Sequence, residues 1–288
     1  MTQSKMKGDA TTGEGERGMV IERRFTQVGK DPFDQFDWVT TDFVINNLDG
    51  SVAYEIPAVS LPSGFSGVPG TICAQKYLRK AGIPAALRKV PEDGIPTWLQ
   101  RSAPDETKMQ KLEADARYVS ESDGRQLFRR LAGTWTYWGW KHGYFAAEAD
   151  ARAYYDEMCF LIASQRSAPN SPQWFNTGLH WAYGIEGPAQ GHWYVDPVTE
   201  EDMRSVNAYE HPQPHACFIQ SVTDSLVGDS DSIMGLWNRE ALLFKFGSGT
   251  GSNFSNIRGA GEPLSGGGTS SGLLSFLKIG DRAAGAIK

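Results

Sequence analysis

The strongest constraint on the fold is an alternation of strand-like and helix-like segments between residues 216 and 288. The run ACFIQSV (216–222) is a strand candidate. Ser230 can cap a helix that follows, because four apolar residues share one helical face: Ile233, Trp237, Ala241 and Phe244. A short extended run and a final helix come next, so the order strand, helix, strand, helix predicts an α/β architecture.

Two glycine-rich loops separate these later elements. Gly247 is expected to end the first helix and to open the loop GSGTGSN (247–253), and the second extended run spans Asn253 to Ile257. The second loop, SGGGTSSG (265–272), leads into a helix that begins near Ser271. Glycine at these positions lets the backbone turn between elements.

Composition divides the whole chain into three regions. Residues 1–19 are polar and are expected to be a disordered tail, because they cannot bury enough apolar surface to offset the entropy of ordering. Residues 20–120 are interpreted as a small accessory region. Residues 121–288 differ from the preceding region in composition and are interpreted as the main α/β part.

Two patterns describe the secondary structure upstream. Short extended pieces within residues 35–65 are broken by a turn at Leu48-Asp49-Gly50. Further on, the aromatic block GTWTYWGWKHGYF (133–145) leads into an amphipathic helix over 146–165.

Charge and cysteine content exclude several classes of protein. The net charge is −6, which gives no basic surface for a nucleic acid backbone, so nucleic acid is not an expected partner. No signal peptide or membrane-spanning stretch is visible, and we expect no membrane partner. The three cysteines, Cys73, Cys159 and Cys217, lie far apart and do not suit a secreted disulfide framework, which favours the cytoplasm.

The two glycine loops each allow a functional and a structural interpretation. GSGTGSN could bring backbone N–H groups to a phosphate, but it lacks the Gly-Lys-Ser/Thr of a Walker loop, and Ser252 replaces the third glycine of a dinucleotide fingerprint. A structural turn is therefore favoured on the loop alone. SGGGTSSG resembles the serine-rich stretch of amidase-signature hydrolases, but the nearest candidate for their activating lysine, Lys245, is too close in sequence.

Cys217 and two nearby histidines raise the question of a metal or redox site. His211 and His215 have a spacing used by zinc sites, yet no further ligand pair completes a set, so we expect structural or loop histidines and no metal. A cysteine that alternates into a strand face is usually a packing residue, and Cys217 alone does not distinguish packing from redox chemistry.

Five unusual segments of the sequence resemble those of a known family. They are SPQWFNTGL (171–179), HACFIQSV (215–222), LFKFGSGTGSNFSNIRG (243–259), PLSGGG (263–268) and SFLKIGDRAAGAIK (275–288). Their order and spacing resemble those of class II ribonucleotide reductases. The stretches GTWTYWGWKHGYF and APNSPQWFNTGLHWAYG are similar to the adenosylcobalamin-dependent branch in particular. The resemblance is specific over residues 120–288 and weaker over residues 30–90.

The resemblance implies a reaction and a role for one cysteine. In that family a thiyl radical, generated with adenosylcobalamin, removes the 3′ hydrogen of a ribonucleotide, and two further cysteines reduce C2′ and become a disulfide. Cys217 matches the first cysteine of the redox pair. The radical cysteine and the second redox cysteine are expected beyond Lys288. The Asp-x-His-x-x-Gly motif of other cobalamin enzymes is missing, so no cobalamin contact can be assigned.

The resemblance also implies substrate and effector residues. Ser171 matches a hydroxyl residue that hydrogen-bonds the substrate, and Ala216 and Gly249 match the backbone wall against the ribose and phosphates. Asp224 matches a carboxylate that binds the sugar of an allosteric deoxynucleotide effector. Arg258 matches an arginine that meets effector phosphates.

The implied fold is the N-terminal portion of a ten-stranded α/β barrel, preceded by the accessory region. The implied activity is reduction of ribonucleotides, taken as ribonucleoside diphosphates, for DNA synthesis. The implied partners are a dithiol reductant such as thioredoxin and a C-terminal complement of the same enzyme, without which the chain is expected to be inactive. A non-catalytic nucleotide-binding or regulatory fragment is the alternative, and an amidase-signature hydrolase is a weaker one.

Overall fold

The computed structural model describes residues 18–46, 49–189, 191–196, 199–245 and 248–287. The helices are α1 (Val68–Ile72), α2 (Glu106–Met109), α3 (Gly124–Lys141), α4 (Glu148–Ala163), α5 (Ser171–Asn176), α6 (Leu179–Tyr183), α7 (Ile233–Lys245) and α8 (Leu273–Ile287). Shorter turns are η1 (Pro32–Gln35), η2 (Ser63–Phe65), η3 (Cys73–Tyr77) and η4 (Ala114–Ala116). None of the helices in the described part of the chain has the length and hydropathy that a membrane-spanning segment requires.

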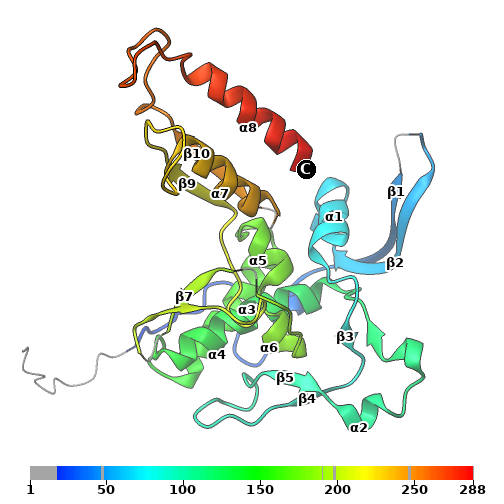
Figure 1. Cartoon of the computed structure of the whole chain (residues 1–288). Coiled ribbons are helices and arrows are strands. Elements are labelled where there is room, and N and C mark those ends of the chain that lie inside the picture. Colours follow the sequence, from blue (N-terminus) through cyan, green and yellow to red (C-terminus); the bar gives the residue numbers. More distant parts are fainter. Residues whose placement is uncertain (1–17, 47–48, 190, 197–198, 246–247, 288) are drawn as a thin grey trace, which may run out of the picture.

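The strands pair two by two. They are β1 (Trp38–Asn46), β2 (Val52–Pro62), β3 (Ile83–Pro84), β4 (Leu87–Lys89), β5 (Ser102–Pro104), β6 (Tyr118–Val119), β7 (Trp193–Val195), β8 (Asp202–Arg204), β9 (Cys217–Ser221) and β10 (Gly249–Asn253). The pair β9–β10 is parallel, and the pairs β1–β2, β3–β6, β4–β5 and β7–β8 are antiparallel. Figure 1 shows a larger body that holds the elements up to α6 and a smaller unit of β9, β10, α7 and α8.

The extended pieces expected within residues 35–65 form a long antiparallel hairpin, which confirms that prediction. Strands β1 and β2 pair from Trp38 opposite Pro62 onward. At the turn, the Asp49 carboxylate accepts a hydrogen bond from the Ser51 N–H at 2.9 Å, and Gly50 has a φ of 84°. Leu48, which was expected in the turn, lies outside the described residues.

Helix α3 begins with a capping box and continues through most of the aromatic block. The Asp123 side chain accepts from the backbone of the first turn, and the Gln126 side chain accepts from the Asp123 N–H at 3.1 Å. The sequence pattern did not indicate that residues 133–141 are helical, because glycine and aromatic residues have low helix propensity. Packing overrides that propensity: a Cβ at Gly133 would lie 2.2 Å from the Trp181 ring, so glycine lets this ring lie against the helix.

The main core joins residues from both sides of position 120. Its buried members are Phe33, Val59, Leu61, Phe65, Cys73, Ala74, Leu78, Leu127, Phe128, Leu131, Ala132, Tyr155, Cys159, Ile162, Ala163 and Trp174. Helix α4, which confirms the helix expected over residues 146–165, supplies four of them. Each fully buried Leu, Ile or Phe contributes about 1.5–3 kcal/mol through burial. The accessory region therefore shares its core with the helices that follow it.

The N-terminal segment lies along α4 rather than separate from it. The N–H groups of Phe25 and Thr26 donate to the Glu157 carboxylate, and Arg23 forms an ion pair with Asp156. Met19, which the sequence placed in the tail, exchanges backbone hydrogen bonds with residues 144 and 146. Residues 1–17 of that tail lie outside the described residues.

The smaller unit confirms the α/β alternation. Helix α7 connects the parallel strands β9 and β10, and α8 follows and packs on α7. A Cβ at Gly280 of α8 would lie 2.4 Å from the Trp237 ring of α7, so glycine permits this close approach. A second core fills the unit: Val222, Ile233, Leu236, Trp237 and Ile257.

Three details of that unit differ from the sequence prediction. The expected glycine loop is itself strand β10, because β9 supplies backbone hydrogen-bond partners to residues 249–253, and Asn253 ends the strand instead of beginning one. The Ser232 hydroxyl, rather than that of Ser230, accepts a hydrogen bond from the first turn of α7, from the Gly235 N–H at 3.1 Å. The described residues form no closed barrel. Gly247 lies outside the described residues.

Candidate functional site

Strands β9 and β10 bring Cys217 and Gly249 side by side. The two residues are register partners, and the Gly249 N–H donates to the Ala216 carbonyl oxygen at 2.7 Å. A Cβ at Gly249 would lie 3.2 Å from the Cys217 Sγ. Glycine therefore leaves room beside the thiol, and the structure brings together three of the residues expected at the substrate wall.

Strand alternation separates the two faces of β9. Cys217 and Ile219 lie on the exposed face, where Ile219 is 94% exposed. Phe218 and Gln220 lie on the opposite face, and the Gln220 side chain accepts a hydrogen bond from Arg239 of α7 at 2.7 Å. The thiol of Cys217 is thus on the side of the strand that α7 does not cover.

The three cysteines differ in accessibility. Cys217 is exposed, whereas Cys73 and Cys159 are buried in the main core. Burial raises the pKa of Cys73 to about 12, and burial also raises the pKa of Cys159. Since the thiolate is the reactive form of cysteine, the two buried residues suit packing. The Cys217 thiol is accessible to solvent.

Asp224 and Arg258 lie beyond the ends of β9 and β10 and are bonded to each other. The Arg258 Nε donates to one carboxylate oxygen of Asp224 at 2.5 Å, and its backbone N–H donates to the other at 3.3 Å. The Arg258 guanidinium also donates to the Pro263 carbonyl oxygen at 2.9 Å. The structure therefore joins the two residues expected to contact an effector.

Ser171 is the first residue of α5 and contacts the N-terminal region. Its hydroxyl lies 3.4 Å from the hydroxyl of Tyr77, and its side chain is otherwise exposed. The Tyr77 ring stacks on Trp174 of the same helix, with ring centroids 5.0 Å apart and planes 12° apart. Sequence reasoning missed Tyr77, because no spacing pattern connects it with a serine so distant in the chain.

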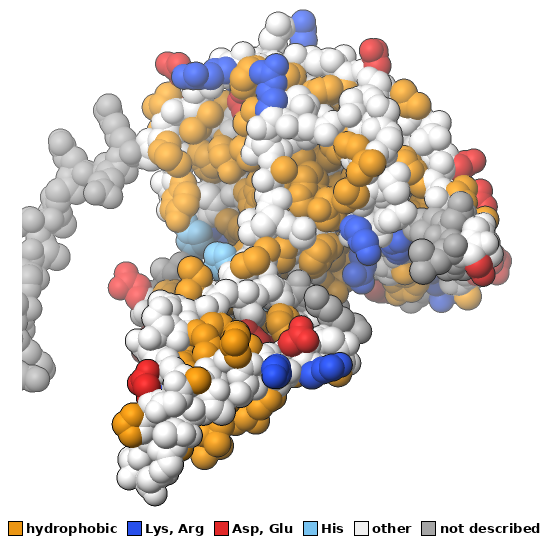
Figure 2. Space-filling view, turned by 90° about the horizontal axis from the view of Figure 1, so that it is seen from above, with side chains coloured by type: hydrophobic (Ala, Val, Ile, Leu, Met, Phe, Trp, Pro, Cys, Tyr) orange, Lys and Arg blue, Asp and Glu red, His pale blue; other side chains and the backbone are white. Residues whose placement is uncertain are grey.

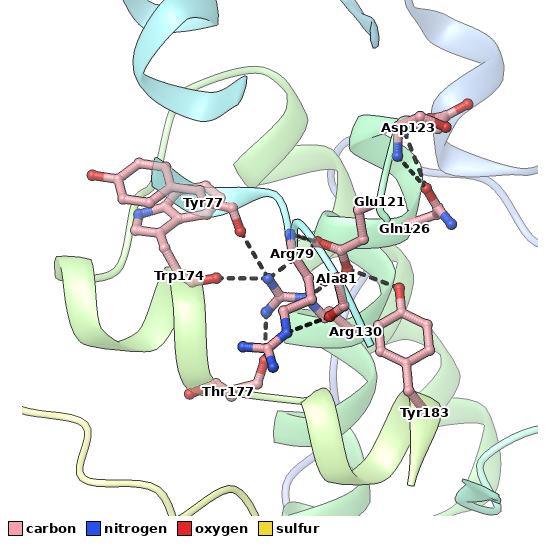
Figure 3. A network of polar contacts seen from close by, with 11 residues as sticks. Tyr77, Arg79, Ala81, Glu121, Asp123, Gln126, Arg130, Trp174, Thr177 and Tyr183 are labelled. Carbon is pink, nitrogen blue, oxygen red and sulfur yellow. Dashed lines mark hydrogen bonds and ion pairs between the residues drawn. The ribbon is translucent and has the colours of Figure 1, made fainter. Parts of the chain in front are cut away.

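A buried arginine, Arg130, contacts the segments that carry Tyr77 and Trp174, as Figure 3 shows. Arg130 of α3 donates to the backbone oxygens of Tyr77 at 3.1 Å, Trp174 at 2.8 Å and Thr177 at 2.6 Å. Its Nε also donates to the Glu121 carboxylate at 2.8 Å, and both side chains are fully buried. The only signal in the sequence is an arginine among apolar residues of a helix.

Glu121 connects the same network to two further segments. Its carboxylate accepts hydrogen bonds from the Arg79 N–H at 2.7 Å and from the Tyr183 hydroxyl at 2.8 Å (Figure 3). Burial, with the neighbouring Glu121 charge, raises the pKa of Tyr183, so its phenol stays protonated and can donate. The charge of Arg130 is paired, as a buried guanidinium requires.

A cavity of about 590 Å³ lies between the larger body and the smaller unit. Pro172 and Asn176 of α5 line it together with Phe218 of β9 and Ser248. Helix α5, which carries Ser171, therefore lies close to the strand pair on its Phe218 side, and no hydrogen bond among the described residues joins Ser171 to Cys217. The cavity meets the Phe218 face of β9 and does not include Cys217.

The histidines near this cavity make packing contacts. Figure 2 shows histidine side chains gathered where the larger body meets the smaller unit. His211 stacks on Tyr194 with ring centroids 3.8 Å apart, and His215 packs edge-on against Phe218. Burial lowers the pKa of His211. Across the described residues, no group of three or more His, Cys, Asp or Glu side chains is arranged to hold a metal ion.

The serine-rich loop that resembles amidases contains a turn. Ser270 is buried, and its hydroxyl accepts a hydrogen bond from the Gly272 N–H at 3.0 Å. Lys245 is the last residue of α7. The Ser270 contact stabilises the approach to α8.

Two family models match the chain. The model described as class II vitamin B12-dependent ribonucleotide reductase matches residues 39–165, from β1 to the end of α4. The model described as the ribonucleotide reductase barrel domain matches residues 215–288, which contain β9, α7, β10 and α8. Together these matches include Cys217 and Gly249, whereas Ser171 lies between them.

Relatives with the same printed name cover nearly the whole chain. A "Vitamin B12-dependent ribonucleotide reductase" of Bradyrhizobium diazoefficiens is 60% identical over 270 residues, which are 94% of this chain and 22% of that protein. The protein so named in Agrobacterium fabrum is also 60% identical, over 94% of this chain and 21% of its own length. The one in Rhodopirellula baltica is 35% identical over 96% of this chain and 23% of its own length.

These relatives are much longer than the matched region. The chain spans about a fifth of the length of the curated relatives it matches. Both family models and the named relatives agree with the resemblance carried by the five sequence segments. The chain belongs to the vitamin B12-dependent, class II ribonucleotide reductase family.

Proposed function

We propose that this chain is part of a ribonucleoside-diphosphate reductase in which Cys217 is one of two thiols that reduce the ribonucleotide. The observation that carries the proposal is the exposed thiol of Cys217 beside Gly249 on a parallel strand pair within the range of the barrel-domain match. Cys73 and Cys159 are buried and do not compete for this role.

The proposed reaction balances with two thiols. The 2′-hydroxyl leaves the ribose as water, a hydrogen replaces it, and Cys217 forms a disulfide with a second cysteine in the part of the protein beyond Lys288. The two thiols supply the two electrons, and a dithiol reductant such as thioredoxin regenerates them by exchange. An exposed thiol suits both steps, because the substrate and the reductant must each reach the Sγ atom.

The substrate is proposed to lie against the exposed face of β9 and β10. The Ser171 hydroxyl would hydrogen-bond the ribonucleotide, and the backbone at Ala216 and Gly249 would form the wall beside the ribose and phosphates. The missing side chain at Gly249 supports this role, because it lets a ligand approach the backbone closely.

A deoxynucleotide effector is proposed to bind at Asp224 and Arg258. The carboxylate would accept hydrogen bonds from the sugar, and the guanidinium would pair with phosphate oxygens. Both residues follow the carboxyl ends of parallel strands, where ligands of α/β sheets commonly bind.

Adenosylcobalamin is the cofactor that the family implies, and when bound it supplies the radical that initiates reduction. Among the described residues, neither of the two cavities lies beside Cys217. The cavity of about 590 Å³ meets the opposite face of β9, and the cavity of about 560 Å³ around Trp135 and Tyr154 does not include Cys217 either. No residue of this chain is therefore assigned to the cofactor.

We infer that β9 and β10 are the first strands of a ten-stranded α/β barrel and that a C-terminal complement provides the other strands. The division into an accessory region over 20–120 and a barrel part over 121–288 also remains a proposal. Three free cysteines suit a reducing compartment, so the cytoplasm is the proposed location.

A non-catalytic nucleotide-binding protein is the second candidate. The Asp224–Arg258 ion pair favours it, because these two residues could bind a nucleotide without any contribution from the redox thiols. The test uses the full-length protein with cytidine diphosphate, adenosylcobalamin and dithiothreitol. The proposed function expects deoxycytidine diphosphate, and no product when adenosylcobalamin is omitted. Binding of deoxynucleotides without any reduction would support the second candidate instead.

A further inference from the structure

Tyr77 occupies an unusual backbone conformation in the N-terminal region. It is the last residue of η3 (Cys73–Tyr77), a π-helical turn. Such turns are rare and often occur at functional sites, because they displace one residue from the regular helical path. Here Tyr77 reaches α5, and its hydroxyl lies 3.4 Å from that of Ser171.

We propose that Tyr77 is a positioning residue, which holds the Ser171 hydroxyl in the orientation that binds the ribonucleotide. The inference rests on the proposed function, in which Ser171 contacts the substrate. It gives the N-terminal region, which lies in the range of the first family match, a part in the substrate site through Ser171.

Two contacts hold Tyr77 in place. The stack on Trp174 fixes the plane of the ring, with centroids 5.0 Å apart. The hydrogen bond from Arg130 to the Tyr77 carbonyl oxygen fixes the backbone, and the same guanidinium holds the carbonyl oxygen of Trp174. Because Trp174 belongs to the helix that Ser171 begins, both partners of the hydroxyl contact are held by one arginine.

Hydrogen-bond chemistry explains why a tyrosine is useful here. A serine hydroxyl has one hydrogen to donate and two lone pairs that accept. With the Tyr77 hydroxyl as donor, Ser171 keeps its own hydrogen for an oxygen of the substrate. The separation of 3.4 Å is longer than an ordinary O–H···O bond, as is common for site contacts that shorten once the ligand is bound.

The test compares kcat and KM for cytidine diphosphate in the full-length reductase and four variants: Tyr77→Phe, Ser171→Ala, their double variant and Tyr118→Phe. Loss of one hydrogen bond predicts that Tyr77→Phe raises KM about three- to tenfold. Phenylalanine keeps the stack on Trp174, so kcat and the melting temperature should stay close to the wild type. Tyr118, 60% exposed in the same region, is the matched control and should have no effect.

The double variant separates positioning from a general structural effect. If Tyr77 acts through Ser171, Tyr77→Phe has no further effect on KM once Ser171 is alanine. Additive effects of the two substitutions on KM, or an unchanged KM in Tyr77→Phe, would overturn the role of Tyr77. The proposed function would still stand in that case, provided that the wild-type protein reduces the ribonucleotide. A wild-type protein that reduces no ribonucleotide would overturn the proposed function and this inference together.

Discussion

The guanidinium of Arg258 and the carboxylate of Asp224 are hydrogen-bonded at 2.5 Å, although the residues are separated by 34 positions in the chain. The pair joins the loop that follows β9 to the loop that follows β10. It therefore closes the carboxyl end of the strand pair. An anionic ligand that binds there would meet a guanidinium already oriented by the carboxylate.

Substitution Asp224→Asn should weaken the binding of deoxynucleotide effectors to the full-length protein roughly tenfold, the size expected when a hydrogen bond to a charged group is lost. The amide cannot accept the same charged hydrogen bonds from Arg258, which then loses its orientation. Calorimetric titration with dATP and with dTTP measures the change. Asp231→Asn, which disturbs a neighbouring ion pair with Arg239, is the control and should leave the affinity unchanged. Equal losses in the two variants would argue against a specific effector contact.

Substitution Cys217→Ser should abolish multiple turnover with a dithiol reductant, because serine cannot form the disulfide that balances C2′ reduction. Deoxynucleotide formation by the full-length enzyme is the measurement. Cys73→Ser and Cys159→Ser should retain turnover, at a stability cost of about 1–2 kcal/mol for placing a hydroxyl in the core. Wild-type rates in Cys217→Ser would show that another cysteine carries the chemistry.

Substitution Gly249→Ala should slow reduction without a large loss of stability. A Cβ at this position would lie 3.2 Å from the Cys217 Sγ, which is tight enough to turn the thiol away from its present direction. Gly251→Ala on the same strand is the matched control, since a Cβ there meets nothing within 4 Å. Steady-state rates and melting temperatures of both variants give the comparison. Equal activity of the two would mean that the space beside the thiol is unimportant.

Much of the fold could be predicted because its signals are local. The strand at 217–221 and the helices α4, α7 and α8 follow from apolar spacing within each segment. The assignment of residues 249–253 failed, because their strand conformation depends on pairing with β9, which lies far away in sequence. Glycine-rich sequence looks like a loop unless the partner strand is known.

In the candidate site, too, residues with a local sequence signal could be predicted, and residues that depend on contacts between distant segments could not. Cys217 could be selected from its sequence context, and its exposure in the fold agrees with that choice. Tyr77 and Arg130 could not, because their contacts join segments that no short pattern connects. A buried arginine that holds three backbone carbonyl groups becomes recognisable only when those carbonyls have been brought together.

The pH dependence of the N-terminal segment can be predicted from Glu157. Burial acts to raise the pKa of this carboxyl, but hydrogen bonds from Thr26 and from the backbone of Phe25 outweigh burial and lower it below its ordinary value. The carboxylate is thus favoured in the folded state. The ionised Glu157 side chain therefore stabilises the fold at pH values above its unfolded pKa of about 4.3. This stabilisation is lost as the pH falls through the lower pKa of the folded state.

The measurement for Glu157 is the melting temperature of wild type and Glu157→Gln as a function of pH. Glutamine cannot carry the charge, so the wild type should be more stable near pH 6, and the difference should shrink below about pH 4. Glu22→Gln, an exposed position of the same segment, should follow the wild type at every pH. A difference that does not depend on pH would rule out the charge as its cause.

Arg130 and Glu121 form a fully buried ion pair. Glu121→Gln should lower the free energy of unfolding by about 3–5 kcal/mol, because it leaves the arginine charge buried and unpaired. Arg130→Met combined with Glu121→Leu should recover only part of this loss. Apolar side chains remove the unpaired charges, but the carbonyl oxygens of Tyr77, Trp174 and Thr177 then lose their donor. Denaturant unfolding of the full-length protein gives the free energy of unfolding of both variants. Full recovery of the wild-type value in the double variant would show that the carbonyl contacts of Arg130 do not contribute to stability.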